Sequence, residues 1–225
     1  MLIAVGVSHF PKIELKEDEK SGSKDSYLAL FKQKYVWLFF LGIFCYVSTE
    51  QGTAIFMRTF LEQYHGVTPQ TAGAQAVSYF WGLMTAGCLV GMLLLKLIDS
   101  KRLLQISGVL TIVLLLSALF GSKGIALIAF PAVGFSISMM YSIVFSLALN
   151  SASQHHGSFA GILCSAIVGG AGGPMIVSTI ADATSLRTGM LFILVFVGYI
   201  TFIGFWARPL INNKTVKLKK LFKKA

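Results

Sequence analysis

The residue best placed to do chemistry in this sequence is Glu50, an acidic side chain in the middle of the apolar run FCYVSTEQGTAIFMRTF. On a helix, Tyr46, Glu50 and Thr53 would share one face at positions i, i+4 and i+7, and Gln51 follows directly. A charge at the centre of a bilayer costs about 2.5 to 3.5 kcal/mol, so a carboxylate in a membrane span is a functional candidate. We therefore expect Glu50 and Gln51 to line an aqueous path and to hydrogen-bond a polar solute. A second interpretation stays open, in which Glu50 is protonated or bonded to another helix as packing.

Three aromatic residues within apolar runs carry a polar tip and form a second group of candidates. They are Tyr79 and Trp81 in YFWGLMTAG, and Tyr141 in SISMMYSIVFSL. An aromatic face of this kind can stack on a sugar ring while its polar tip bonds the hydroxyls. Each of them alone fits packing or an anchor at the membrane interface equally well.

The elements that must position these residues are helices that cross a membrane. Of the 225 residues, 55% are hydrophobic and only 12% charged, against roughly 25% charged in a soluble domain. Helical spans need about 20 apolar residues, and none of the runs here alternates as a strand of a membrane barrel would. We predict an all-α membrane protein with six transmembrane helices, at 35–61, 71–97, 103–120, 125–149, 158–181 and 189–207.

The net charge of +10 lies mostly at the two ends of the chain. That distribution is typical of a membrane protein with both termini in the cytoplasm, and it argues against a nucleic-acid partner. The sequence divides into a stub of a preceding transmembrane helix (1–10), a charged cytosolic linker (11–34), the six-helix domain (35–207) and a basic cytoplasmic tail (208–225). The partner expected from composition is the lipid bilayer.

The sequence shows no pattern typical of a metal site, a cofactor site or an enzyme active site. Cys45, Cys88 and Cys164 lie far apart in apolar runs without metal-ligand spacing, so we expect neither a metal nor a cofactor. The run VGGAGGP lacks the preceding strand of a nucleotide loop. Together with the GxxxG pairs 87–91, 157–161 and 169–173, it predicts close helix packing, with a kink at Pro174. An intramembrane protease would need glycine where Gln105 stands, and an enzyme is not expected.

Four ordered segments resemble the C-terminal half of sugar:proton symporters of the fucose and glucose/galactose permease type, in the major facilitator superfamily. They are FCYVSTEQGTAIFMRTF, GVTPQTAGAQAVSYFWGLMTAGCLVG, MMYSIVFSLALNSAS and IVGGAGGPMIVSTIADATS. The resemblance implies a parent of two six-helix halves that hold the sugar between them and rock to expose it to either side. It also implies a bacterial inner membrane.

In that family the first and fourth spans of each half line the cavity, which places Glu50, Gln51, Tyr141 and Asn150 toward the substrate. The implied partners are a monosaccharide, a proton, and a separate N-terminal half or a second copy. The sequence departs from the family at Ser142, where proline is common, and at Cys88, where arginine is common. The acidic groups that usually carry the proton belong to the N-terminal half. The alternative is therefore a truncated or split half-transporter without transport activity alone.

Overall fold

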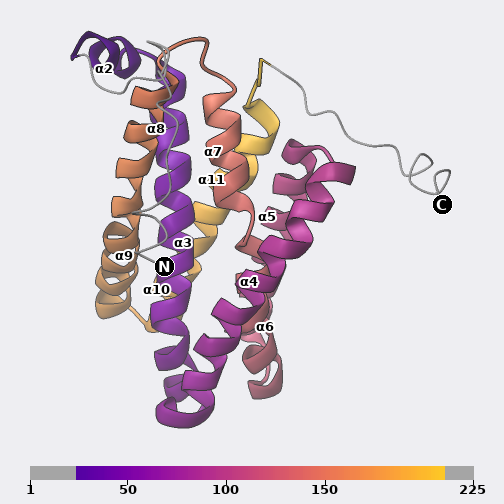
Figure 1. Ribbon diagram of the computed structural model, residues 1–225. Coiled ribbons are helices and arrows are strands. Elements are labelled where there is room, and N and C mark those ends of the chain that lie inside the picture. Colours follow the sequence, from indigo (N-terminus) through magenta and orange to yellow (C-terminus); the bar gives the residue numbers. More distant parts are fainter. Residues whose placement is uncertain (1–23, 211–225) are drawn as a thin grey trace, which may run out of the picture.

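The computed structural model describes residues 24–210, which form a bundle of helices (Figure 1). The predicted helix stub and most of the basic tail lie outside these residues. Six helical segments within them are long and apolar enough to cross a membrane, which confirms the predicted fold class. Their bounds are Lys34–His65, Pro69–Leu97, Ser100–Phe120, Lys123–Leu149, His156–Ala183 and Leu186–Trp206.

The first and third spans are single α-helices, and the second is an α-helix preceded by one π-helical turn. The first is α3 (Lys34–His65), the second combines a π-helical turn η2 (Pro69–Gly73) with α4 (Ala74–Leu97), and the third is α5 (Ser100–Phe120). Local residues set their ends. Gly66 takes φ 58° after α3 and donates its N–H to the Glu62 carbonyl, a left-handed cap that glycine adopts without strain. Asp99 caps α5 by accepting a bond from the Lys101 N–H.

The other three spans are interrupted. The fourth consists of α6 (Lys123–Ile137) and α7 (Met140–Leu149), and the sixth of α10 (Leu186–Leu191) and α11 (Ile193–Trp206). At the α6–α7 break the hydroxyls of Ser136 and Ser138 donate to carbonyls three residues earlier, Val133 and Phe135. Such bonds offer the backbone an alternative to its helical partners.

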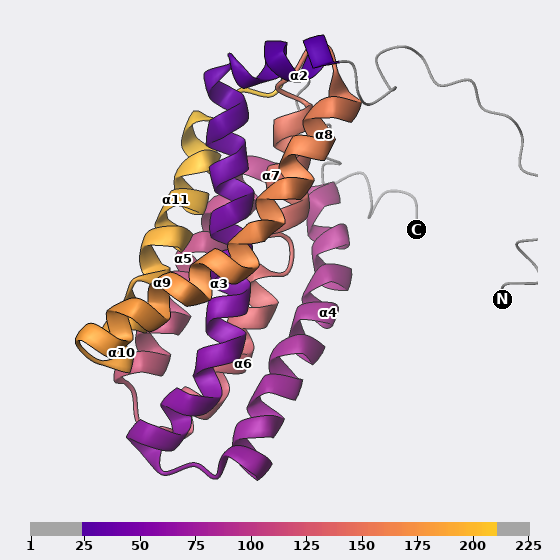
Figure 2. The same cartoon turned by 90° about the vertical axis from the view of Figure 1, so that its left-hand side faces the viewer.

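The fifth span contains Pro174, where a kink is predicted, inside one helix. It runs through α8 (His156–Ser165), a 3-10 turn η3 (Ala166–Val168) and α9 (Gly169–Ala183), and α9 continues through Pro174. The 3-10 turn is a departure from α-helical geometry that lies directly before the glycine run. Figure 2 shows α8 and α9 crossing α3 at an incline.

A short helix lies within the stretch predicted as a linker. It is α2 (Lys24–Phe31), which lies across the end of the bundle beside α8 (Figures 1 and 2). Leu30 is only 3% exposed and belongs to the core, and Tyr27 packs against that core. The composition of this stretch does not reveal the helix, because its two packed apolar residues stand among charged ones.

Glycine lets the spans approach closely, as the GxxxG pairs predicted. A Cβ on Gly169 would collide with the backbone of Phe44, and one on Gly173 with Ser48. The Ser48 hydroxyl also donates to the Gly169 carbonyl over 3.0 Å. In the same way Gly87 and Gly91 of α4 meet the α6–α7 break. The third pair differs, because a Cβ on Gly161 would come only to 3.3 Å from the Tyr27 hydroxyl.

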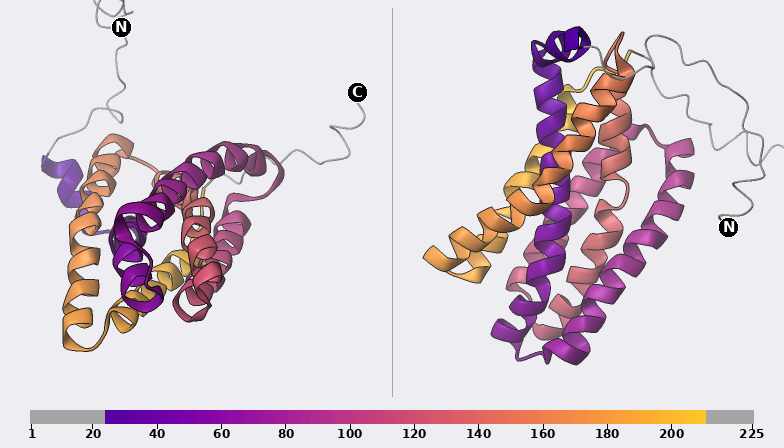
Figure 3. Two further views of the ribbon diagram at one scale, coloured as in Figure 1. Left: turned by 90° about the horizontal axis from the view of Figure 1, so that it is seen from below. Right: turned by 60° about the vertical axis from the view of Figure 1, so that its left-hand side comes forward.

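The first and fourth spans form the centre of the bundle. In each, 61% of the most apolar stretch is buried, against 17% in the second span and 33% in the fifth. Figure 3 shows α4 at the edge of the bundle in both views. Its outer surface carries large exposed apolar side chains, among them Leu89, Met92 and Leu93.

Candidate functional site

A cavity of about 520 Å³ lies between α3, α4 and the start of α7, within the range usual for small-molecule sites. We call it the central cavity. It is lined by Tyr46, Val47, Glu50, Gln51, Trp81, Met84, Thr85, Cys88, Ser138, Tyr141, Ser142 and Ile167. Five of the eight residues predicted from sequence are among them: Tyr46, Glu50, Gln51, Trp81 and Tyr141.

Helix α3 supplies the polar wall of the central cavity. The Gln51 amide donates from Nε2 to Oε1 of Glu50 over 3.2 Å, and the Tyr46 side chain interacts with the same carboxyl group. No cation is among the residues that line the cavity, so the partners of the Glu50 carboxyl group there are the uncharged side chains of Gln51 and Tyr46. The ring of Tyr46 lies 5.6 Å from that of Tyr141, which joins this wall to α7.

Helix α4 supplies the opposite wall, most of which the sequence reading missed. Trp81, Met84, Thr85 and Cys88 follow one another at i, i+3, i+4 and i+7, the spacing of a single helix face. The Cys88 thiol donates to the Ser138 carbonyl, with sulfur and oxygen 3.4 Å apart. The sequence does contain a signal for this wall: the residues that share a helix face with Trp81, three, four and seven positions later, are the ones that line the cavity.

Thr53 and Tyr79 were predicted as site residues, but neither lines the central cavity. Tyr79 stands two positions from Trp81, hence on a different face of α4, and is 62% exposed. Thr53 is fully buried, and its hydroxyl has no hydrogen-bond partner among the described residues. The face of α3 that carries Thr53 is covered by neighbouring helices, and Met57 on it is fully buried as well.

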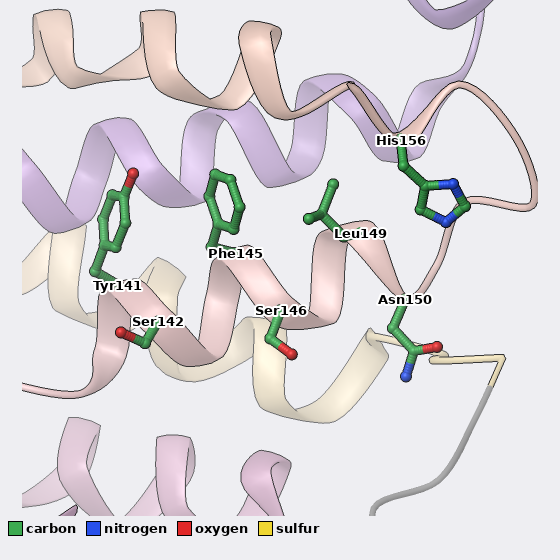
Figure 4. Close-up of a pocket in the computed structure, with 7 residues that line it drawn as sticks. All are labelled: Tyr141, Ser142, Phe145, Ser146, Leu149, Asn150 and His156. Atoms are coloured by element: carbon green, nitrogen blue, oxygen red, sulfur yellow. The ribbon is translucent and has the colours of Figure 1, made fainter. Parts of the chain in front are cut away.

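Asn150 lies in a second cavity of about 520 Å³ along α7, which we call the α7 groove (Figure 4). It is lined by Tyr141, Ser142, Phe145, Ser146, Leu149, Asn150 and His156. Tyr141 and Ser142 also line the central cavity, so the two cavities adjoin. Together they run from the Glu50 region to the end of α7.

The two edges of the α7 groove differ in chemistry. Figure 4 shows Tyr141, Phe145 and Leu149 pointing to one side and Ser142, Ser146 and Asn150 to the other. The rings of Tyr141 and Phe145 are nearly parallel, with an interplanar angle of 20° and centroids 5.8 Å apart. An apolar edge beside a row of hydroxyl and amide groups suits a ligand that is itself apolar on one face and polar around its rim.

His156 closes the far end of the α7 groove, where α8 begins. The residue before it, His155, adopts φ 60° and ψ 35°, a left-handed conformation uncommon outside glycine. No group of three or more His, Cys, Asp or Glu side chains that could hold a metal ion occurs within residues 24–210.

Comparisons with known proteins place this geometry in a family. The model of the Major Facilitator Superfamily matches residues 1–174. The chain belongs to the Major Facilitator Superfamily. This confirms the family expected from the four sequence segments.

The relatives and solved structures agree with that membership. The chain is 32% identical over 193 residues to a glucose/galactose transporter of Brucella abortus biovar 1 (strain 9-941), a match that covers 85% of this chain and 47% of the relative. A crystal structure of the E. coli fucose:proton symporter superposes with a TM-score of 0.78 at 18% identity, over 92% of this chain and 51% of that one. Another structure of that symporter, in the outward conformation, gives the same values. The chain thus spans about half the length of the proteins it matches and has the fold of one half of a facilitator.

Proposed function

We propose that this chain is the C-terminal half of a transporter that moves a monosaccharide across the membrane by proton symport. The substrate class is fucose, glucose, galactose or a similar hexose. The observation that carries the proposal is the central cavity, where a carboxylate and an amide on α3 face an indole on α4 and two phenol rings. Hydroxyls of a sugar need both acceptors and donors, and its ring face packs on aromatic groups. The names of the relatives support the same class.

Glu50 acts in this proposal as an acceptor of sugar hydroxyl bonds rather than as the proton carrier. It is the one acidic residue among those that line the central cavity, and its carboxyl group is already engaged by Gln51 and Tyr46. Proton coupling then requires acidic groups on the other wall, which the N-terminal half supplies.

The second wall comes from a separate N-terminal half or from a second copy of the chain. Within the described residues the central cavity is bounded by α3, α4, η3 and the α6–α7 region alone, and α4 is left largely uncovered. The alternative is a half-transporter that has no transport activity by itself. The same observation supports it, since this chain bounds the cavity on one side only.

The proposed orientation puts both chain ends in the cytoplasm of a bacterial cell, with the protein in the inner membrane. It follows from the basic residues at one end of the spans, which outnumber those at the other. The first set is Lys32, Lys34, Lys96, Lys101, Arg102 and Arg208, and the second is Arg58, Lys123 and Arg187.

The test is uptake of radiolabelled hexoses into vesicles driven by an inward proton gradient. We expect no uptake by the chain alone, and uptake when it is co-expressed with the N-terminal half of a relative. Uptake by the chain alone would contradict the need for a separate N-terminal half and would make a homodimer the working model. Failure of both preparations, with both halves inserted and assembled, would contradict sugar symport.

A further inference from the structure

A third cavity, of about 550 Å³, lies between the start of α3 and the end of α11. We call it the basic cavity. Its polar lining includes Lys32, Lys34 and Arg208, and no acidic side chain is among the described residues that line it. Three cations therefore meet around one hollow without a carboxylate to compensate them.

The inner part of the basic cavity is apolar, and Gln33, Tyr35 and Ser151 complete its lining. Leu38, Phe39 and Trp206 form its inner wall, and the rings of Phe39 and Trp206 lie 5.0 Å apart. The Tyr199 hydroxyl donates to the Leu38 carbonyl over 2.9 Å, which ties α11 to α3 at this level.

Arg208 is held in place although it follows the last helix. The carbonyl of the preceding residue, Ala207, accepts a bond from Lys101 Nζ over 2.7 Å. Two residues later the Leu210 N–H donates to the Asn150 carbonyl over 2.8 Å. These bonds hold the backbone on both sides of Arg208, and the Arg208 side chain lines the cavity.

The basic cavity sits where the membrane surface must be. The first span begins at Lys34 and the sixth ends at Trp206, and Figure 2 shows these two helix ends at the same end of the molecule. Trp37, in the first turn of the first span, is half exposed and donates its indole N–H to the Phe31 carbonyl. Tryptophan at a span end is typical of the interface between hydrocarbon and water. A ligand here can thus place a charged group in the interface and an apolar part in the bilayer.

We infer that the basic cavity binds the phosphate headgroup of an anionic phospholipid, whose acyl chains lie along Leu38 and Trp206. Basic pockets between spans at a membrane surface suit such headgroups. The Arg208 guanidinium can bind two phosphate oxygens at once, and the lysines act as point charges. Free phosphate offers the same chemistry to the cations but leaves the apolar wall uncovered. This inference is independent of any sugar substrate.

The experiment uses the full chain in phosphatidylcholine vesicles that contain a small fraction of phosphatidylglycerol brominated on its acyl chains. Bromine quenches nearby indoles, and the changes Trp37→Phe and Trp81→Phe leave Trp206 as the reporter. We expect stronger quenching of Trp206 by brominated phosphatidylglycerol than by brominated phosphatidylcholine at the same fraction. Equal quenching by the two lipids would overturn the inference.

The specificity of the basic cavity is tested with charge-matched variants. Lys34→Gln with Arg208→Gln should weaken phosphatidylglycerol binding by roughly fivefold per cation. The control is Lys96→Gln with Arg102→Gln, two cations at the same end of the bundle that do not line the cavity. An equal loss of phosphatidylglycerol binding in the control would show that the effect comes from the overall surface charge, and it would overturn the inference.

A second arm separates a lipid from free phosphate. Inorganic phosphate at the salt-matched concentration should leave the quenching of Trp206 unchanged, because it gains nothing from the apolar wall. Displacement of the lipid by inorganic phosphate at similar concentration would show a phosphate site instead and overturn the lipid assignment.

Discussion

The Gln51 amide and the Glu50 carboxylate are hydrogen-bonded to each other, with Nε2 and Oε1 separated by 3.2 Å. Adjacent positions on a helix do not face one another, so this bond requires the two side chains to turn toward each other, and both line the central cavity. The pair presents carboxylate acceptors next to amide donor and acceptor groups. A sugar hydroxyl, which donates and accepts at once, is matched by such a pair.

The change Glu50→Gln should weaken hexose binding to the assembled transporter by about tenfold or more, because a hydrogen bond to a charged group contributes about 1.5 to 3 kcal/mol. Equilibrium dialysis with labelled hexose measures the effect. Glu62→Gln is the control, since Glu62 lies on the same helix but does not line the cavity. Unaltered hexose affinity of the Glu50→Gln variant, with normal membrane insertion, would indicate that Glu50 serves helix packing and not sugar binding.

The aromatic wall on α4 gives a second prediction about binding. If the central cavity binds a hexose as proposed, Trp81→Ala should reduce its affinity several-fold, because an aromatic face on which the sugar can stack is lost, and Trp81→Phe should retain most of it. Tyr79→Ala serves as the matched control, two positions away and outside the cavity. The same dialysis assay measures all three variants. A larger loss from Tyr79→Ala than from Trp81→Ala would contradict the assignment of this wall.

The limits of the spans were predictable because each depends on local sequence. Long apolar runs set the lengths of the spans. Residue types that favour helix caps, such as Gly66 after α3 and Asp99 before α5, mark where the spans end and begin. The breaks in spans four, five and six were not predictable in this way. At Ser136 and Ser138 a hydroxyl competes with the backbone, and most serines in helices do so without interrupting them.

Of the residues predicted on α3, Tyr46, Glu50 and Gln51 line the central cavity, whereas on α4 only Trp81 does. Glu50 stands out because its charge in an apolar run is costly. Thr85 and Cys88 are unremarkable in composition, and only the position of the α4 face relative to α3 and α7 gives them a place in the cavity. Thr53 shares the face of Glu50 but is covered by neighbouring helices, which periodicity within one helix does not reveal.

The packing of α9 against α3 predicts a stability effect at Gly169. Gly169→Ala should destabilise the protein by about 1 to 3 kcal/mol, because its Cβ meets the Phe44 backbone, which has no rotamer with which to move aside. Thermal unfolding in detergent measures the change. Gly198→Ala is the control, since nothing lies within 4 Å of a Cβ there, and it should be neutral or stabilising by helix propensity. Equal melting temperatures for the two variants would contradict this close contact.

The α7 groove predicts a pattern of water access that also tests the orientation of the chain. In a background with Cys88→Ser and Cys164→Ser, Ser146→Cys should react quickly with a membrane-impermeant thiol reagent because Ser146 lines the groove. Leu147→Cys, one position on, should react slowly because that side chain is only 3% exposed. The reagent should act in inside-out vesicles and not in right-side-out vesicles, since α7 ends on the side of the proposed cytoplasmic termini. Equal rates at the two positions would exclude a water-filled groove, and reaction only from the outer face would reverse the topology.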